Sequence, residues 1–128
     1  MAGVKRYEDL VVWKLSNELQ RQVFAITVRG AVTKDLKFRD QIRHSSASAS
    51  RNIAEGFARY RPAEFARFLE IARGSLTETH NHLRVGLDRG YFSRSDRERL
   101  SLLIGRAAIA ATRLLRYLKS HKGLEPLA

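Results

Sequence analysis

Cysteine is absent from the 128-residue sequence, and proline occurs only twice, at Pro62 and Pro126. Without cysteine the chain has no disulfide framework, no thiol nucleophile and no cysteine zinc site. No apolar run approaches the roughly 18 residues of a membrane span, and the N-terminal residues lack the apolar region of a signal peptide. No Val/Ile/Thr-rich alternating stretch indicates a β-strand. These absences favour an all-α protein in the cytoplasm without a membrane partner.

Basic residues greatly outnumber acidic ones in this sequence. The chain has 24 Lys and Arg residues against 13 Asp and Glu residues, a net charge of +11 in 14.6 kDa. This length predicts one domain. So large a positive excess favours a polyanionic partner, either nucleic acid or an acidic surface.

Apolar residues recur every three or four positions in four segments, which predicts helices over about 8–28, 38–60, 62–89 and 95–120. Pro62 suits a first helical turn, and Ser95 with Glu98 fits a capping box. Gly30 and Gly90 are placed to end helices. The predicted fold is an antiparallel up-down four-helix bundle over residues 1–122, followed by a flexible tail over 123–128.

Several apolar residues lie beside or off the main helical stripes: Phe24, Phe68, Ile71 and Ile109. A bundle of this size cannot bury all of them alone, which favours self-association; the alternative is that the helices have wide core faces. The small residues of 45–50, together with Gly56 and Gly74, predict places where two helices approach closely.

The positive excess lies in residues 37–61 and 93–128, whereas residues 62–92 are balanced. In the predicted fourth helix no acidic residue lies between Arg99 and Lys122, and basic residues there repeat at helical spacing. The candidate phosphate-binding residues are Arg99, Arg106, Arg113, Arg116 and Lys119, with Arg39 and Arg43 of the second helix. The alternative is that these stripes are only solvated helix faces. Because no base-reading motif is present, contacts to the nucleic-acid backbone should dominate.

No catalytic constellation is present. A di-metal bundle needs two Glu-x-x-His motifs, and this chain has none. Asp40 and His44 share one helical face, but two ligands do not make a metal site. His80 and His82 point in nearly opposite directions, and no Gly-rich phosphate loop or nucleophile motif occurs. We therefore expect no enzyme activity, no cofactor and no metal.

Three short blocks carry a resemblance to a known family. Tyr7-Glu-Asp-Leu-Val-Val-Trp13, Asn52-Ile-Ala-Glu-Gly-Phe57 and the segment 64–78 resemble, in order, the signatures of the 23S rRNA intervening-sequence proteins. The resemblance implies an up-down four-helix bundle that commonly forms a homopentameric ring. It also implies kinship with the accessory proteins of diversity-generating retroelements, which bind reverse transcriptase and nucleic acid. One departure is Ser50, where the family often has proline, so the second helix should run straighter here.

Polar residues of these blocks form two sets, Asn52, Glu55 and Arg59 on the second helix and Arg73, Ser75 and Glu78 on the third. We expect them to form a cross-helix network in which Glu55 pairs with Arg73, because guanidinium and carboxylate pair bidentately. A ligand site is the alternative. The sequence thus predicts a non-enzymatic basic bundle that self-associates and binds nucleic acid or a nucleoprotein. The alternative function is a protein–protein interaction scaffold with no nucleic-acid role.

Overall fold

The computed structural model describes residues 3–120, and every regular element in that range is helical. Two 3₁₀ turns precede the first and second long helices. The elements are η1 Tyr7–Asp9, α1 Val11–Ile26, η2 Ala31–Lys34, α2 Leu36–Ala58, α3 Pro62–Asp88 and α4 Arg94–Ser120. The all-α fold is confirmed. The predicted tail over 123–128 lies outside the described residues.

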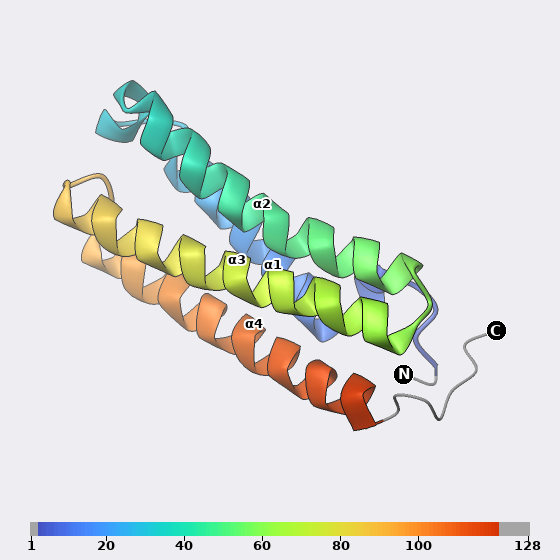
Figure 1. The fold of residues 1–128 in the computed structure, drawn as a ribbon. Coiled ribbons are helices and arrows are strands. Elements are labelled where there is room, and N and C mark those ends of the chain that lie inside the picture. The colour runs from blue at the N-terminus through green and yellow to red at the C-terminus, as the bar shows by residue number, and fades with distance from the viewer. Residues whose placement is uncertain (1–2, 121–128) are drawn as a thin grey trace.

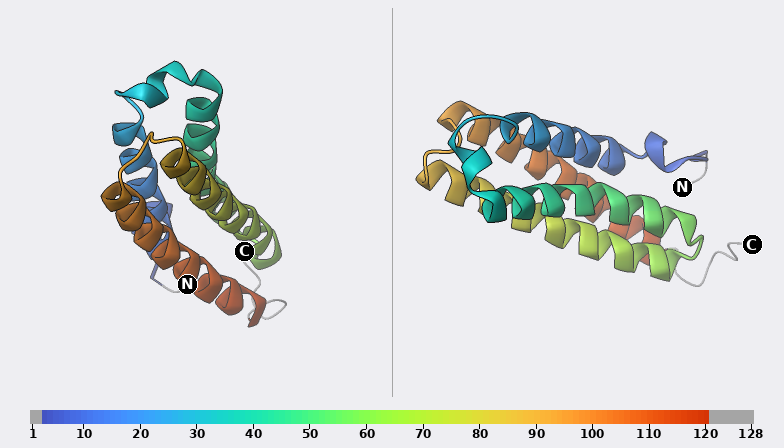
Figure 2. Two further views of the ribbon diagram at one scale, coloured as in Figure 1. Left: turned by 90° about the vertical axis from the view of Figure 1, so that its left-hand side faces the viewer. Right: turned by 90° about the horizontal axis from the view of Figure 1, so that it is seen from above.

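The four helices run alternately up and down, as Figures 1 and 2 show. α2 packs against α1 and α3, and α4 packs against α3 and α1, so the four helices close into a bundle. Short connections force this order, because consecutive antiparallel helices must lie side by side. The predicted bundle is confirmed.

The core runs the length of the bundle in two clusters of buried apolar residues. Leu19, Ile42, Leu83 and Leu100 are fully buried near the η2 end. Ile53, Leu69, Ala111 and Leu115 fill the other half. These residues belong to the helical stripes of the sequence, and each large aliphatic side chain contributes about 1.5–3 kcal/mol by leaving water.

Two predicted helix ends are wrong. α4 begins at Arg94 because the Ser93 hydroxyl oxygen accepts the backbone N–H of Asp96 at 3.0 Å, so Ser93 rather than Ser95 is the cap. α1 ends at Ile26, two residues before the predicted end at 28, and its cap is Thr27 rather than Gly30: Thr27 is in a non-helical conformation and donates its hydroxyl to the Val23 carbonyl at 2.8 Å.

The predicted end of α3 is confirmed. Gly90 has a φ of +75°, and the next N–H, from Tyr91, reaches back to the Gly86 carbonyl at 2.8 Å. This is the hydrogen bond that closes a helix through a left-handed residue, a conformation that glycine adopts without strain. Pro62 is at the start of α3, as predicted.

The serine-rich middle of α2 is a close contact with α3, as predicted. The Ser45 hydroxyl meets that of Thr79 at 2.8 Å, and Ser48 meets Ser75 at 2.9 Å. All four residues are buried, and α2 runs unbroken through Ser50. Small hydroxyl side chains let two backbones approach while each buried polar group keeps a partner.

The two predicted glycine contacts differ in outcome. A methyl group on Gly56 would lie 2.7 Å from Cβ of Phe68, so α2 and α3 do approach closely there. The prediction for Gly74 is wrong, because a Cβ there would meet no atom of residues 3–120 within 4 Å. Helical spacing places Gly74 on the side of α3 that faces away from the core.

Candidate nucleic-acid interface

The outer face of α4 carries three exposed arginines, Arg106, Arg113 and Arg116. Arg106 and Arg113 are two helical turns apart, and Arg116 lies one turn beyond Arg113, so all three share one side of the helix. Within residues 3–120, none of the three has an ion-pair or hydrogen-bond partner. Their charges are therefore available to an anion from outside the bundle.

The two ends of the predicted stripe are engaged within the bundle. Arg99 donates to the Gln22 side-chain oxygen at 2.8 Å and to Asp96 at 2.9 Å, which ties α4 to α1. The Lys119 ammonium lies 3.8 Å from the Glu70 carboxylate. Exposed pairs of this kind contribute at most about 1 kcal/mol each, so a phosphate can compete for these cations.

The two candidate arginines of α2, Arg39 and Arg43, have neighbours within the bundle. Arg43 donates to the Thr27 hydroxyl at 2.8 Å and to the Thr27 carbonyl at 3.2 Å, which fixes α2 against the end of α1. The Arg39 guanidinium lies 3.9 Å from Asp40, and its buried Nε has no hydrogen-bond partner among the described residues. The α2 face is thus less open to a polyanion than the middle of α4.

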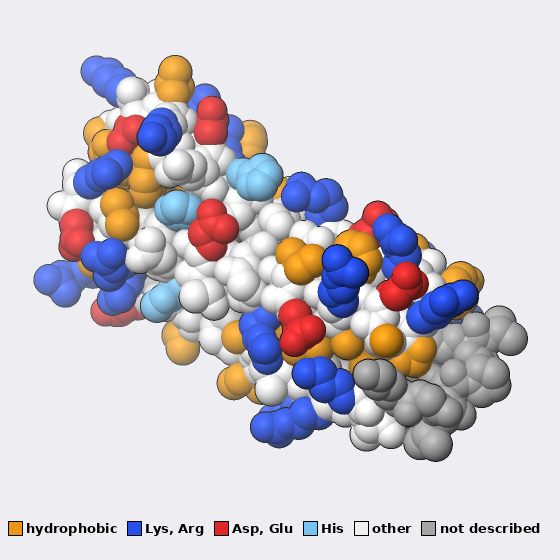
Figure 3. Space-filling model, viewed as in Figure 1, with side chains coloured by type: hydrophobic (Ala, Val, Ile, Leu, Met, Phe, Trp, Pro, Cys, Tyr) orange, Lys and Arg blue, Asp and Glu red, His pale blue; other side chains and the backbone are white. Residues whose placement is uncertain are grey.

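Aliphatic side chains lie among the free arginines of α4. Leu102 is 71% exposed and Ile109 is 54% exposed. A recess of about 600 Å³ lies beside them against His80 of α3, and another of about 370 Å³ lies against Arg113 and Arg116. In Figure 3 apolar side chains and then a group of basic ones lie along the lower edge, over α4, whereas acidic groups interrupt the basic ones over α3.

The predicted polar network is present in part. The Asn52 amide donates to the Ser48 carbonyl at 2.8 Å and to its hydroxyl at 3.0 Å, and that hydroxyl meets Ser75. Asn52 and Ser75 thus belong to one α2–α3 network whose centre is Ser48. The sequence marks Ser48 only as one of a run of small residues.

The predicted Glu55–Arg73 pair is wrong. Glu55 pairs with Arg59 of its own helix at 3.5 Å, and Arg73 donates to Thr112 of α4 at 3.4 Å. The reason is geometric: Arg73 and Ser75 are two residues apart, about 200° around the helix, so both cannot face α2. Glu78 pairs within its own helix too, with His82 at 3.4 Å.

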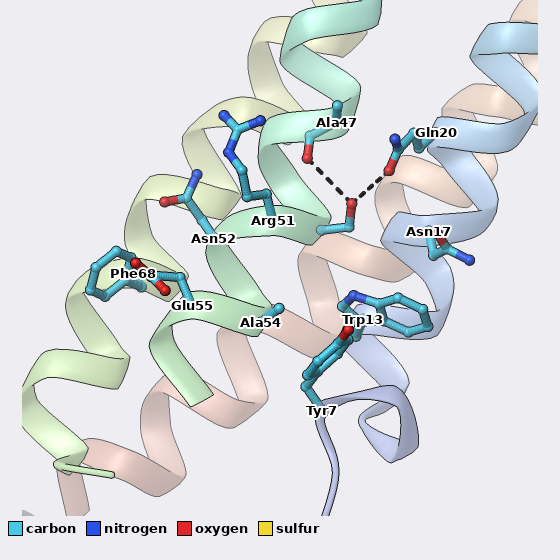
Figure 4. Close-up of a pocket in the computed structure, with 11 residues that line it drawn as sticks. Tyr7, Trp13, Asn17, Gln20, Ala47, Arg51, Asn52, Ala54, Glu55 and Phe68 are labelled. Atoms are coloured by element: carbon cyan, nitrogen blue, oxygen red, sulfur yellow. Dashed lines mark hydrogen bonds between the residues drawn. The ribbon is translucent and has the colours of Figure 1, made fainter. Parts of the chain in front are cut away.

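A hollow of about 730 Å³ lies over the outer side of α2, and residues from all three resembling blocks line it. Tyr7 and Trp13 pack edge to face at 5.2 Å on the α1 side, and Phe68 of α3 lies across α2 from them (Figure 4). Asn52 and Glu55 also line the hollow. The blocks therefore converge in space on one concave surface.

Groups with a perturbed pKa lie at the other end of the bundle. The Tyr91 phenol donates to the Asp35 carboxylate at 2.6 Å, and Arg89 donates to the same oxygen at 3.1 Å. The bond from Tyr91, joined by that from the Phe38 backbone, lowers the pKa of Asp35. The same bond raises the pKa of Tyr91. This cluster joins the start of α2 to the turn after α3.

Metal ligands do not gather in the part of the chain that the structure describes. No three His, Asp or Glu side chains within residues 3–120 are placed to hold one ion. No helix in the same range is long and apolar enough to cross a membrane. The candidate surfaces of the bundle carry guanidinium groups, amides and aromatic rings.

Comparison with known protein families places this chain in one of them. Residues 8–109 match the family described as 23S rRNA-intervening sequence protein. The chain belongs to this family. The membership predicted from the three blocks is thereby confirmed.

A solved structure supports the same bundle. It comes from Bacteroides thetaiotaomicron and is described as a protein with unknown function from the S23 ribosomal protein family. It is 24% identical to this chain and superimposes with a TM-score of 0.76, covering 85% of this chain and 98% of its own. At that identity the likeness shows the fold alone. No curated protein matches the chain.

Proposed function

We propose that this intervening-sequence family protein is a non-enzymatic cytoplasmic bundle that self-associates and binds nucleic acid through phosphate contacts. The observation that carries the proposal is the outer face of α4, where Arg106, Arg113 and Arg116 are exposed and without partners among the described residues. Each guanidinium that neutralises a phosphate releases counterions, which makes binding favourable and salt-dependent. Arg99 and Lys119, at the two ends of this stripe, are proposed as additional phosphate contacts.

Self-association multiplies this surface. The family resemblance implies a homopentameric ring, in which five copies of the α4 stripe would act together. Large apolar side chains that stay exposed in one copy support association, among them Val11 at 63% and Leu102 at 71%. Light scattering should therefore give a mass several times 14.6 kDa, with fivefold as the expected value.

A protein–protein scaffold is the second candidate, and Leu102 with Ile109 is the observation that favours it. Gly105 lies between them on the same recessed face, and a Cβ there would meet no atom within 4 Å in the part of the chain that the structure describes. An aliphatic face with a glycine gap suits a packed helix as well as a phosphate chain. The two candidates differ in how binding responds to salt.

The test replaces Arg106 and Arg113 together with Gln and follows binding of a labelled RNA and a labelled DNA as salt is raised. The slope of log affinity against log salt should shrink by roughly 1.4–1.8 per engaged subunit. The matched control, Arg67→Gln with Arg84→Gln on α3, removes the same charge from another exposed surface. Equal salt slopes for the two double variants would show that nucleic acid does not bind at Arg106 and Arg113. If the parent protein binds no nucleic acid at low salt, the protein–protein scaffold becomes the favoured function.

A further inference from the structure

A cleft between α1 and α2 combines an aromatic ring, arginines and amides. It measures about 470 Å³, and its walls include Phe24, Arg21, Arg43, Asn17 and Gln20. No carboxylate within residues 3–120 lines it. This combination is the one that single-stranded nucleic acid needs: a π face for a base, cations for phosphate and amides for a base edge.

The aromatic wall of the cleft is held in place. Phe24 is 55% exposed, and the Arg43 guanidinium carbon lies 4.3 Å from the centre of its ring. Arg43 is itself fixed by its two hydrogen bonds to Thr27. One side of the ring is thus covered by a guanidinium that does not need to be ordered on binding, while Phe24 as a residue keeps more than half of its surface exposed.

The amides of the cleft keep free hydrogen-bonding capacity. The Gln20 oxygen accepts the Ser50 hydroxyl at 2.8 Å, which orients the carboxamide, and its NH₂ group has no partner among the described residues (Figure 4). Asn17 has no hydrogen-bond partner in the same part of the chain. Covering these groups with an apolar helix face would cost free energy, because their hydrogen bonds to water would be lost.

We propose that this cleft binds an unpaired nucleotide of a single-stranded nucleic acid. The base stacks on the open side of Phe24, Asn17 and Gln20 meet its polar edge, and Arg21 takes the adjoining phosphate. Paired bases in a duplex are already stacked and cannot enter, so the cleft selects single strands. The proposal rests on the proposed nucleic-acid function and adds the form of the ligand.

The neighbouring surface gives the strand a path. The cleft shares Asn17, Gln20 and Ala47 with the hollow over α2, which adds the exposed Arg51 and the ring of Trp13. From Phe24 to Trp13 is 11 residues of helix, about 16 Å at 1.5 Å per residue. A strand stacked at Phe24 therefore continues over cationic and aromatic surface, with Glu18 beside Arg21 and Glu55 in the hollow as acidic neighbours.

The experiment measures affinity of the full chain for an oligo-uridine strand, an oligo-adenosine strand and an RNA duplex of equal length. Phe24→Leu keeps an apolar side chain and removes the π face. It should weaken binding of the single strands about 5- to 150-fold, the range expected for one lost base stack. Its affinity for the duplex and its mass by light scattering should not change. The matched control, Tyr60→Leu, removes an aromatic that is 72% exposed at the α2–α3 turn and should leave single-strand affinity unchanged.

The outcomes separate this inference from the proposed function. If the Arg106/Arg113 double variant weakens binding while Phe24→Leu does not, the cleft is not the nucleotide site and the α4 function stands. If Phe24→Leu weakens single-strand binding while the α4 variant changes nothing, the cleft stands and the α4 function falls. A lower mass for Phe24→Leu would make the cleft a contact between copies, and no binding of any strand by the parent would reject both.

Discussion

Gly56 provides the sharpest test of how α2 and α3 pack. A Cβ at this position would lie 2.7 Å from Cβ of Phe68 and 2.8 Å from Cδ1 of the Phe65 ring. The Phe65 ring can turn, but Cβ of Phe68 is attached to the α3 backbone and moves only if the two helices separate. Gly56→Ala therefore overpacks the contact that the serines of α2 also occupy.

Two opposing effects set the expected change in the free energy of unfolding. Overpacking a tight interior costs about 1–3 kcal/mol, and replacing glycine by alanine inside a helix returns up to about 1 kcal/mol. Gly56→Ala should thus destabilise the fold by roughly 1–2 kcal/mol. Gly74→Ala has only the helical gain, because no atom of the described residues lies within 4 Å of the added Cβ, and it should stabilise the fold by roughly 0.5–1 kcal/mol.

Urea unfolding followed by far-UV circular dichroism measures both changes, with all variants at one protomer concentration because association shifts apparent stability. The sign should differ between the two variants although the chemical change is the same. An equal gain in both would show that α2 and α3 are not in close contact at Gly56. A loss at Gly74 would show that another copy packs against that face of α3.

Two further predictions concern side-chain partners. Arg73→Ala should cost no more than about 1 kcal/mol in the same urea assay, because the one hydrogen bond that its side chain makes within residues 3–120, to Thr112, is 3.4 Å long. A larger loss would show that Arg73 is buried by a contact between copies or by a tighter bond. The Asp35 pKa is lowered by folding, so its stabilisation is complete above the ordinary value of 3.8 and disappears as pH falls through the lowered pKa. The Tyr91 pKa is raised, so its contribution is complete below 10.0 and disappears as pH rises through the raised pKa. Tyr91→Phe should remove the alkaline loss and weaken the acid one in unfolding curves recorded across pH; an unchanged profile would refute the coupling.

Some of the candidate site follows from sequence spacing, and some does not. Arg106 and Arg113 are seven residues apart on a helix whose apolar stripe is unambiguous, so their exposure on one side follows from the helical period. The engagement of Arg99 with Gln22, and of Arg43 with Thr27, joins residues of different helices. No spacing along one segment reports such a contact, and for this reason the predicted stripes include arginines that the bundle itself uses.

Apolar periodicity and short connections can be read from the sequence alone. They set the four helices, the order in which these pack and the side of each that is buried. The family could also be predicted from the sequence, because three short blocks resemble its signatures. The rotation of each helix about its axis was decided only by tertiary packing. That rotation turned Arg73 to α4 rather than to Glu55 and brought Phe24, Arg43 and the amides of α1 around one cleft. A few tens of degrees of rotation change which side chains meet, and the interlocking of whole surfaces sets that angle rather than any one residue.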